Sequence, residues 1–315
     1  MSKIFNKGDG GIGVIGRNGH IAIKSLTLVY IEISIAVLFW GFSFIWTNSL
    51  IHHNIPIFAF IFFRMAIGGL TMSIIALLLR KFQKVDKADW KWFFLLAVFE
   101  PFIYFIFESF GLKATDSPTL AAVIIATIPI FTMITDYIVY KTKMSLLNII
   151  GTIITLPGIL LIVLKGNNIS VKYWWGIVFL MIAVLSTIGY SIATKNLTNK
   201  YNGYTITAYQ FIIGSMYFLP FFLTVGQKGF SIDMMLKWDV LYPLLSLAVF
   251  CSAICYALYT QAIKNLGITK ASVFTAVNPA IAAIGAFLVG QENLSWSKII
   301  GIFIVIFGVI LSQRR

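Results

Sequence analysis

The chain has 315 residues, of which 59% are hydrophobic and only 11% are charged, and its mean hydropathy is +0.91. Soluble globular domains carry about 25% charged residues, so this composition excludes an ordinary soluble protein. The formal net charge of +13 raises the question of a nucleic-acid partner, and the answer depends on where the basic residues lie.

Long apolar runs follow one another along the chain, separated by short polar segments. A helix needs about 20 apolar residues to cross a bilayer, whereas a transmembrane barrel needs short segments of alternating polarity, which this sequence lacks. The sequence therefore predicts an all-α membrane protein with ten transmembrane helices. The predicted spans are 28–50, 56–79, 92–112, 118–140, 146–164, 173–195, 205–226, 239–263, 269–290 and 296–312.

Basic residues gather in alternate connecting segments. If the N-terminus is cytoplasmic, 17 of the 24 lysines and arginines fall in cytoplasmic segments and 6 in external ones. This asymmetry is the positive-inside pattern, and it predicts a multi-pass protein of the cytoplasmic membrane with both termini in the cytoplasm. Membrane topology thus accounts for the positive charge, and no nucleic-acid partner is expected.

Two features suggest cofactors, and neither has the context that a cofactor site needs. The segment "GGIGVIG" at 10–16 fits the pattern G-x-G-x-x-G, but no strand is predicted before it and no soluble helix after it. We interpret residues 1–27 as a flexible cytoplasmic tail. Cys251 and Cys255 lie one turn apart without further ligands, so they favour helix packing over a zinc site. No metal or cofactor is expected.

The second half of the chain repeats the first. "VYKTKMSLLNIIG" at 139–151 returns as "VGQENLSWSKIIG" at 289–301, and Pro129 matches Pro279. The match continues at offsets of 146 to 151 across five spans, which predicts two repeats at 28–164 and 173–312. Because five is odd, the second repeat starts on the opposite side of the membrane. The sequence therefore predicts a 5+5 inverted repeat, an arrangement found in many secondary transporters.

Three stretches carry a family resemblance. They are "AVLFWGFSFIW" at 36–46, "GLKATDSPTLAAVIIATIPIF" at 111–131 and "AIKNLGITKASVFTAVNPAIAAIGAFLVGQENLS" at 262–295. Over about residues 30–312 the chain resembles the drug/metabolite transporter superfamily, specifically its tandem EamA-type ten-helix permeases. The resemblance implies a secondary transporter of a small organic solute, by default an amino acid or related metabolite, with export favoured. Residues 141–143 depart from the family, which often has a Gly-Glu-Arg-like turn there.

Arg64, Glu100 and Glu108 are ionisable residues that lie within predicted spans. Each costs about 2.5–3.5 kcal/mol at mid-bilayer on insertion scales, so each must be paired or face water. At about 1.5 Å per residue, Arg64 falls between the two glutamates in depth and can pair with either, which leaves one glutamate over. The aligned residues of the second repeat, Gln210, Cys251 and Tyr259, are uncharged.

Two interpretations of these charges stay open. On the first interpretation, the first repeat holds a site for a charged cargo or a proton. On the second, Arg64 pairs with one glutamate and only holds two helices together. On the first interpretation, the predicted substrate and proton pathway consists of Arg64, Glu100, Glu108, Trp40, Tyr104, Gln210, Tyr259 and Asn278, with Tyr190 and Tyr256 as further cavity aromatics. Pro129 and Pro279 are predicted to interrupt their helices and to act in gating.

Other functions compete with transport by a carrier. A membrane-embedded enzyme acting on lipid or prenyl substrates needs Asp, His or Arg clusters at one interface, and the sequence shows none, so no enzyme is expected. A passive channel is also compatible with an inverted repeat. Glycines at 151, 158, 301 and 308 predict close packing of the fifth and tenth spans, either within one chain or in a homodimer.

Overall fold

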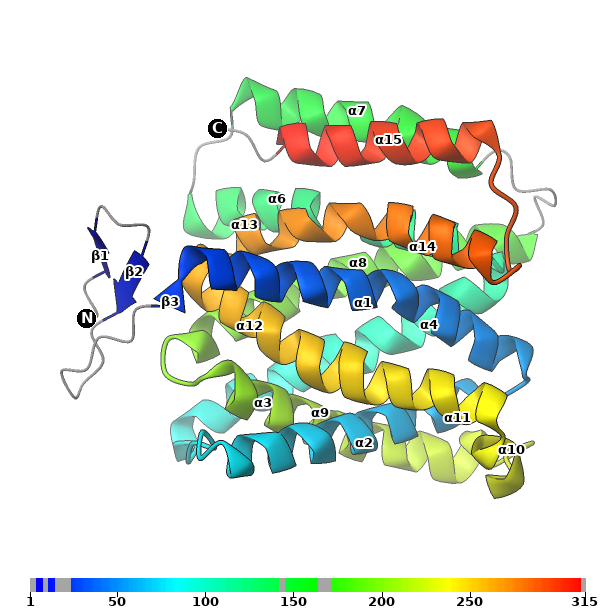
Figure 1. Cartoon of the computed structure of the whole chain (residues 1–315), viewed down its shortest axis with the longest axis horizontal. Helices are drawn as coiled ribbons and strands as arrows, with labels where there is room; N and C mark the ends of the chain where they lie inside the picture. The colour runs from blue at the N-terminus through cyan, green and yellow to red at the C-terminus, as the bar shows by residue number, and fades with distance from the viewer. Residues whose placement is uncertain (1–3, 8–10, 15–23, 142–144, 164–170, 313–315) are drawn as a thin grey trace.

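The computed structural model describes residues 4–7, 11–14, 24–141, 145–163 and 171–312. Most of these residues form helices that run back and forth along one axis, which is horizontal in Figure 1. Helix α1 begins, and helix α15 ends, at the same end of the bundle. We call this end, on the left of Figure 1, the near end, and the opposite one the far end.

The helices are labelled in Figure 1, and their bounds are as follows. They are α1 (Leu26–His52), α2 (Ile57–Leu78), η1 (Lys87–Asp89), α3 (Trp90–Ala97), η2 (Val98–Ile103), α4 (Tyr104–Thr115), α5 (Pro118–Ile125), α6 (Ile128–Tyr140), α7 (Leu146–Val163), α8 (Val171–Thr198), α9 (Gly203–Phe221), η3 (Phe222–Gly226), α10 (Ile232–Leu236), α11 (Trp238–Leu245), η4 (Ser246–Ile254), α12 (Cys255–Leu266), α13 (Ile268–Val273), η5 (Phe274–Val277), α14 (Asn278–Leu288) and α15 (Trp296–Ser312).

Eight helical segments of the described chain are long and apolar enough to cross a membrane. They cover residues 26–52, 57–78, 87–115, 118–135, 171–198, 203–226, 238–266 and 270–288. Two further apolar helices, at 146–162 and 296–312, are shorter. The structure is therefore that of a multi-pass helical membrane protein, and every predicted span overlaps one of these ten segments.

The long helices of the two halves are interrupted at matching places. Segment η2 connects α3 to α4, and η4 connects α11 to α12 about 150 residues later; both are π-helical. In η2, Pro101 disfavours helical geometry at the residue before it, and Glu100 adopts extended angles of φ −149° and ψ 114°. A widened turn leaves backbone carbonyls without their usual helical partners, and such turns are frequent at functional sites.

Pro129 and Pro279 lie beside a second pair of interruptions, but not in the way that the sequence suggested. The chain breaks between α5 and α6, and again through η5 before α14. Pro279 occupies the first turn of α14 and Pro129 follows the first residue of α6. A proline at a helix start removes no intrahelical hydrogen bond. The prediction of mid-helix interruption was thus wrong in mechanism, although each proline does mark a break.

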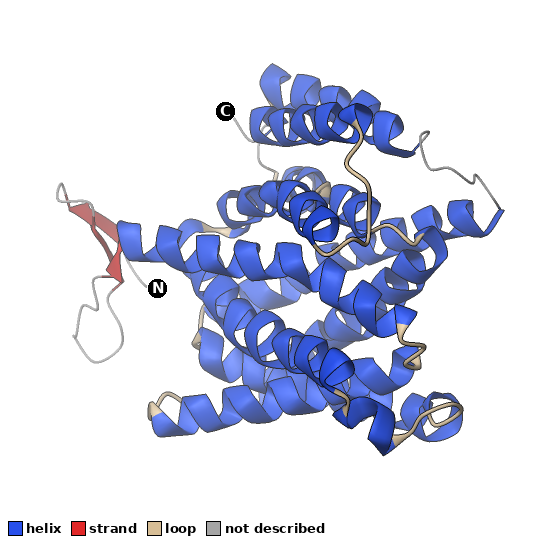
Figure 2. Cartoon of the chain, turned by 45° about the vertical axis from the view of Figure 1, so that its right-hand side comes forward, coloured by secondary structure: helices blue, strands red, loops and turns tan. Residues whose placement is uncertain are grey.

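Helices of the two halves pack against each other rather than forming separate bundles. Helix α2 packs along α9, α4 along α8, and α1 along α12. The two short helices α7 and α15 pack along each other and lie to one side of the remaining helices (Figure 2). The core is therefore shared between the halves, and its centre is an interface between them.

Glycines bring α7 and α15 into backbone contact. A Cβ atom built on Gly301 lies 2.8 Å from the carbonyl oxygen of Gly158, and one built on Gly308 lies 2.8 Å from that of Gly151. No side chain fits at such distances without displacing the neighbouring backbone. The predicted close packing of the fifth and tenth spans is confirmed, and within one chain it uses these glycines.

The N-terminal part of the chain contains strands as well as undescribed residues. Strands β1 (Ile4–Lys7), β2 (Gly11–Val14) and β3 (Lys24–Ser25) form an antiparallel sheet in the order β1-β2-β3, close to the start of α1 (Figure 2). The sheet departs from the expectation of an all-α chain. Gly16 of the glycine motif lies outside the described residues, while Gly11 and Gly13 belong to a strand.

Adding a side chain at Gly301 tests the contact between α7 and α15. In Gly301→Val the new side chain meets the carbonyl of Gly158 and the side chain of Ile162, whose Cγ1 lies 2.7 Å from the built Cβ. Overpacking of this kind costs about 1–3 kcal/mol, so thermal unfolding in detergent should occur several degrees lower. The control is Ile153→Leu on the exposed side of α7, which should leave the melting temperature unchanged. Equal melting temperatures for the native chain and Gly301→Val would contradict the contact.

Candidate functional site: a charged cavity at the bundle centre

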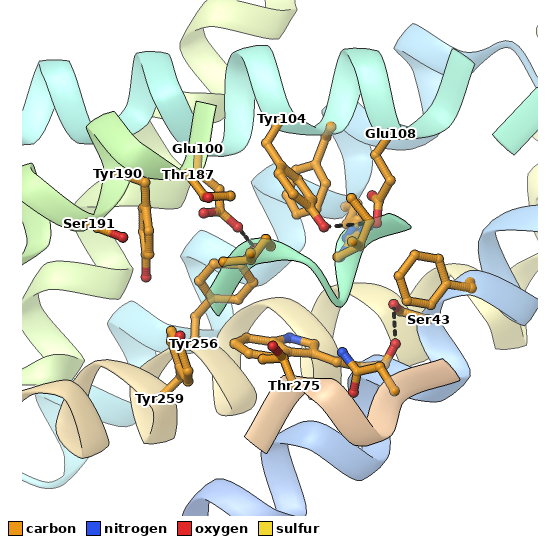
Figure 3. Close-up of a pocket in the computed structure, with 17 residues that line it drawn as sticks. Ser43, Glu100, Tyr104, Glu108, Thr187, Tyr190, Ser191, Tyr256, Tyr259 and Thr275 are labelled. Carbon is orange, nitrogen blue, oxygen red and sulfur yellow. Dashed lines mark hydrogen bonds between the residues drawn. The ribbon is translucent and has the colours of Figure 1, made fainter. Parts of the chain in front are cut away.

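A narrow cavity of about 60 Å³ lies where the two halves meet. Side chains from both halves point toward it in Figure 3. Seven of the eight predicted pathway residues line it: Trp40, Arg64, Glu100, Tyr104, Glu108, Tyr259 and Asn278. Tyr190 and Tyr256 line it as well. The cavity has room for only a few water molecules.

The acidic wall of the cavity comes from η2 and α4. Glu100, Tyr104 and Glu108 follow one another at intervals of four residues, and all three line the cavity although Glu100 itself has extended backbone angles. The hydroxyl of Tyr256 donates to Oε1 of Glu100, and that of Tyr104 donates to Oε1 of Glu108 at 3.3 Å (Figure 3). Each carboxyl group is thus held by a tyrosine, and both are buried.

Arg64 supplies the positive charge of the cavity, and its side chain is held by neutral groups. Its Nε donates to the hydroxyl of Ser252 at 2.9 Å, and its Cζ lies 4.0 Å from the centre of the Phe105 ring. Among the ion pairs of the described residues, none joins Arg64 to Glu100 or Glu108 within 4.0 Å. The predicted bidentate pair is therefore absent from this part of the chain, and the alternative of a simple helix lock loses its main contact.

The opposite wall is aromatic. Trp40 donates from Nε1 to the carbonyl of Cys251 at 3.0 Å, which is one of the carbonyls within η4. Its ring meets those of Tyr256 and Tyr259 edge-on, with centroids 5.1 and 4.9 Å away. The hydrogen bond orients the indole, and the indole in turn packs against the two tyrosines, so the three rings form one packed wall.

Asn278 brings an amide to the cavity from the start of α14. Its side chain is 3% exposed, and its Oδ1 has no hydrogen-bond partner in the described structure. Leaving a buried carbonyl oxygen unpaired costs about 1–3 kcal/mol. A ligand that donates a hydrogen bond to Asn278 would recover this free energy, which makes Asn278 a candidate ligand contact.

Gln210 is the one predicted pathway residue that does not line the cavity. It is fully buried, and its Nε2 donates to the carbonyl of Glu100 at 2.9 Å. This carbonyl belongs to the extended residue of η2 and therefore lacks a regular helical partner. Gln210 thus supports the backbone beneath the acidic wall.

Several lining residues were not predicted. Ser43, Thr187, Ser191 and Thr275 place hydroxyl groups around the cavity (Figure 3). Ser43 lies one turn after Trp40, and Ser191 one turn after Thr187. A search for hydroxyl residues one turn from the predicted aromatics would have found some of them, but small polar residues are common in packed membrane helices and stand out little.

A larger hollow of about 600 Å³ lies on the other side of α1 and contains none of the buried charges. Aromatic side chains dominate its lining, including Phe39, Trp46, Trp238 and Tyr242, and its acidic residue Asp239 is exposed. By size alone this hollow is the better candidate for a binding site, but the buried ionisable side chains line the smaller cavity. The central cavity is therefore the candidate functional site.

Comparison with known proteins connects this architecture to a family. The sequence profile of the EamA-like transporter family matches the chain twice, at residues 27–164 and 174–313. The chain belongs to the EamA-like transporter family. Each match covers one half of the bundle, so the central cavity lies between two EamA units.

Proteins similar to this chain are described as uncharacterized transporters. The chain is 25% identical over 288 residues to an uncharacterized transporter of Archaeoglobus fulgidus, covering 91% of this chain and 97% of that protein. It is 22% identical over 304 residues to the uncharacterized transporter YetK of Bacillus subtilis, covering 95% and 90%. A crystal structure that is 14% identical superposes with a TM-score of 0.68 over 91% of this chain and 98% of the other, and it shares the fold. The family indicates a membrane transporter and not an enzyme.

Polar contacts tie the two EamA units together at both ends of the bundle. At the far end, Glu292 accepts from the hydroxyl of Ser117 at 2.8 Å and from the amide of Thr119 at 3.0 Å, while its other oxygen lies 2.7 Å from Nζ of Lys298. At the near end, Lys200 lies 2.8 Å from Asp89, and its hydrogen bond to that carboxylate raises the pKa of the lysine.

Glu292 should contribute more to stability than its ionic partner. Glu292→Ala removes three contacts of a carboxylate that is only 6% exposed, and hydrogen bonds to charged groups are worth about 1.5–3 kcal/mol each. We expect a loss of about 2–3 kcal/mol and a clearly lower melting temperature. Lys298→Met removes only the ion pair of a partly exposed lysine, so about 1 kcal/mol or less is expected. Melting curves showing equal losses for both variants would contradict the role of the Ser117 and Thr119 contacts.

Proposed function

We propose that this chain is a secondary transporter that carries an amino acid or a related small metabolite across the cytoplasmic membrane. One observation carries the proposal. A buried cavity between the two EamA units contains a guanidinium group and two carboxyl groups that are not paired with each other. Buried ionisable groups without an ionic partner are costly, and they are typical of substrate and ion pathways.

The distribution of charge in the cavity suits a zwitterion. Arg64 can receive a carboxylate, and the acidic wall can receive an ammonium group. The aromatic wall of Trp40, Tyr256 and Tyr259 offers ring faces to an ammonium group or an apolar side chain. A purely anionic cargo would meet two carboxyl groups, and a purely cationic one would meet Arg64. An amino acid satisfies both signs at once.

An inverted repeat supplies the mechanism of the proposed transport. The two EamA units each contribute five apolar helices, with matched interruptions at η2 and η4 and at the starts of α6 and α14. The proposed 5+5 arrangement turns one unit upside down relative to the other. Exchanging the conformations of the two units would then open the central site first to one side of the membrane and afterwards to the other.

The orientation of the chain and the direction of transport are part of the same proposal. The positive-inside pattern favours a cytoplasmic near end, because α1 begins and α15 ends there. Resemblance to metabolite-efflux members of the superfamily favours export. If one glutamate receives the cargo ammonium group, the other is available to load and release a proton as access changes, which would couple export to the proton gradient.

Counterflow in proteoliposomes tests this function. Proteoliposomes that contain the purified protein are loaded with one unlabelled L-amino acid at a time. For at least one of the twenty amino acids, they should accumulate the labelled form of the same amino acid from outside. Glu100→Gln and Glu108→Gln remove charge that the cargo or proton requires, so at least one should lower the rate about tenfold or more. Asp239→Asn is the control, because its carboxylate is exposed and outside the cavity.

Two results would count against the proposal. Native rates in both glutamine variants would remove the acidic wall from the mechanism. Flux that shows no stimulation by cargo on the opposite side would favour a channel, since exchange requires a site that reorients while it is occupied. An uptake rate that does not change with an imposed proton gradient would contradict only the coupling of transport to protons.

A further inference from the structure

The side chain of Arg64 is held in place by a contact that has a counterpart in the other EamA unit. We infer that Ser252 and Gly68 position the guanidinium group of Arg64 toward the cargo. This inference rests on the proposed function, because the cargo carboxylate is the group that Arg64 would receive. The argument comes from the geometry of two joints that connect the halves of the chain.

The first joint connects α2 to η4. Arg64 donates from Nε to Ser252, and both residues are buried. One turn further along α2, a Cβ built on Gly68 lies 3.0 Å from the carbonyl oxygen of Ala248 and 3.1 Å from Cβ of Ser252. The absence of a side chain at Gly68 therefore lets α2 approach η4 closely enough for Ser252 to reach Arg64.

The second joint connects α9 to η2 and uses the aligned residues. Gln210 lies 146 residues after Arg64, and Gly214 lies 146 residues after Gly68. Gln210 donates from Nε2 to the carbonyl of Glu100 at 2.9 Å. A Cβ built on Gly214 would collide with the ring of Pro101, the residue that aligns with Ser252. Each joint thus combines a long polar side chain, a glycine one turn later and a π-helical segment of the other unit.

The two joints differ in whether their polar side chain lines the cavity. Gln210 does not line the cavity, so its joint is purely structural. Arg64 does line it, and guanidinium has five N–H donors, of which the bond to Ser252 uses one. Phe105 covers the group near its central carbon, which limits its rotation. Ser252 and Phe105 together fix the plane of the guanidinium, and the remaining donors are available to a carboxylate.

Ser252 is therefore a positioning residue, and it was hidden from sequence analysis. It lies 188 residues from Arg64 in the sequence and is fully buried among small residues of η4. Replacing its hydroxyl leaves Arg64 held only by the ring contact. The guanidinium then samples several orientations, which weakens a bidentate bond to cargo more than it weakens the bundle.

The first test follows Arg64 itself and needs no cargo. Purified protein is treated with phenylglyoxal, and modification of the peptide containing Arg64 is measured by mass spectrometry over time. We expect Ser252→Ala to raise the modification rate at least threefold and Ser252→Thr, which keeps the hydroxyl, to retain the native rate. Gln210→Leu is the matched control, because it breaks the other joint and should leave the rate at Arg64 unchanged. Equal rates for the native chain and Ser252→Ala overturn the inference.

The second test uses counterflow of the transported L-amino acid, with its methyl ester as the competing probe. The ester lacks the carboxylate that Arg64 would bind. We expect Ser252→Ala to raise KM for the acid about tenfold while inhibition by the ester stays unchanged, so that discrimination between acid and ester falls. Gly68→Ala should act in the same direction by forcing α2 away from η4. Gln210→Leu should lower the maximal rate without altering discrimination.

The results separate this inference from the proposed function. Native discrimination in Ser252→Ala, in a chain that still transports the acid, overturns the positioning role and leaves the function standing. Absence of counterflow for all twenty amino acids in the native chain overturns transport of an amino acid, while the phenylglyoxal rates still decide whether Ser252 holds Arg64. A lower melting temperature in Ser252→Ala with native modification and KM would assign Ser252 a structural role and overturn the inference.

Discussion

The burial of three ionisable side chains inside an apolar bundle is the constraint on which the rest of the structure depends. Each costs about 2.5–3.5 kcal/mol at mid-membrane, and in the described structure Arg64 is paired with neither glutamate. Tyrosine hydroxyls, the hydroxyl of Ser252 and the ring of Phe105 offset part of this cost. Neutral partners leave the charges able to bind something else, which a closed ion pair would prevent.

The two EamA units share a common architecture but contribute different residues to the cavity. Both interrupt the same helices, and both place a long polar side chain and a glycine against the interruption in the other unit. The first unit contributes the charges, whereas the second contributes Tyr256, Tyr259 and Asn278. Under the proposed function, matched joints would let the two units exchange conformations, and the asymmetric lining would give the cargo a defined orientation.

Sequence alone predicted what depends on local pattern. The apolar runs predicted the helices, the offset paired Pro129 with Pro279, and the ionisable residues within spans identified Arg64, Glu100 and Glu108, which line the cavity. It failed where a contact depends on residues far apart in the chain. The partner of Arg64 is a serine 188 residues away, which no charge pattern reveals. Gln210 aligns with Arg64 and was predicted to share its role, yet a shorter side chain bound to the carbonyl of Glu100 keeps it out of the cavity.

The most direct test of the account is the accessibility of the central cavity from each side of the membrane. Ser43→Cys introduces a thiol into the cavity wall, in a chain whose buried Cys251 and Cys255 are first replaced by alanine. Membrane-impermeant thiol reagents are applied to right-side-out and inside-out vesicles, with and without cargo. Alternating access predicts labelling from both sides, with cargo shifting the balance between them. Labelling from one side only, in protein that still exchanges cargo, would contradict the account.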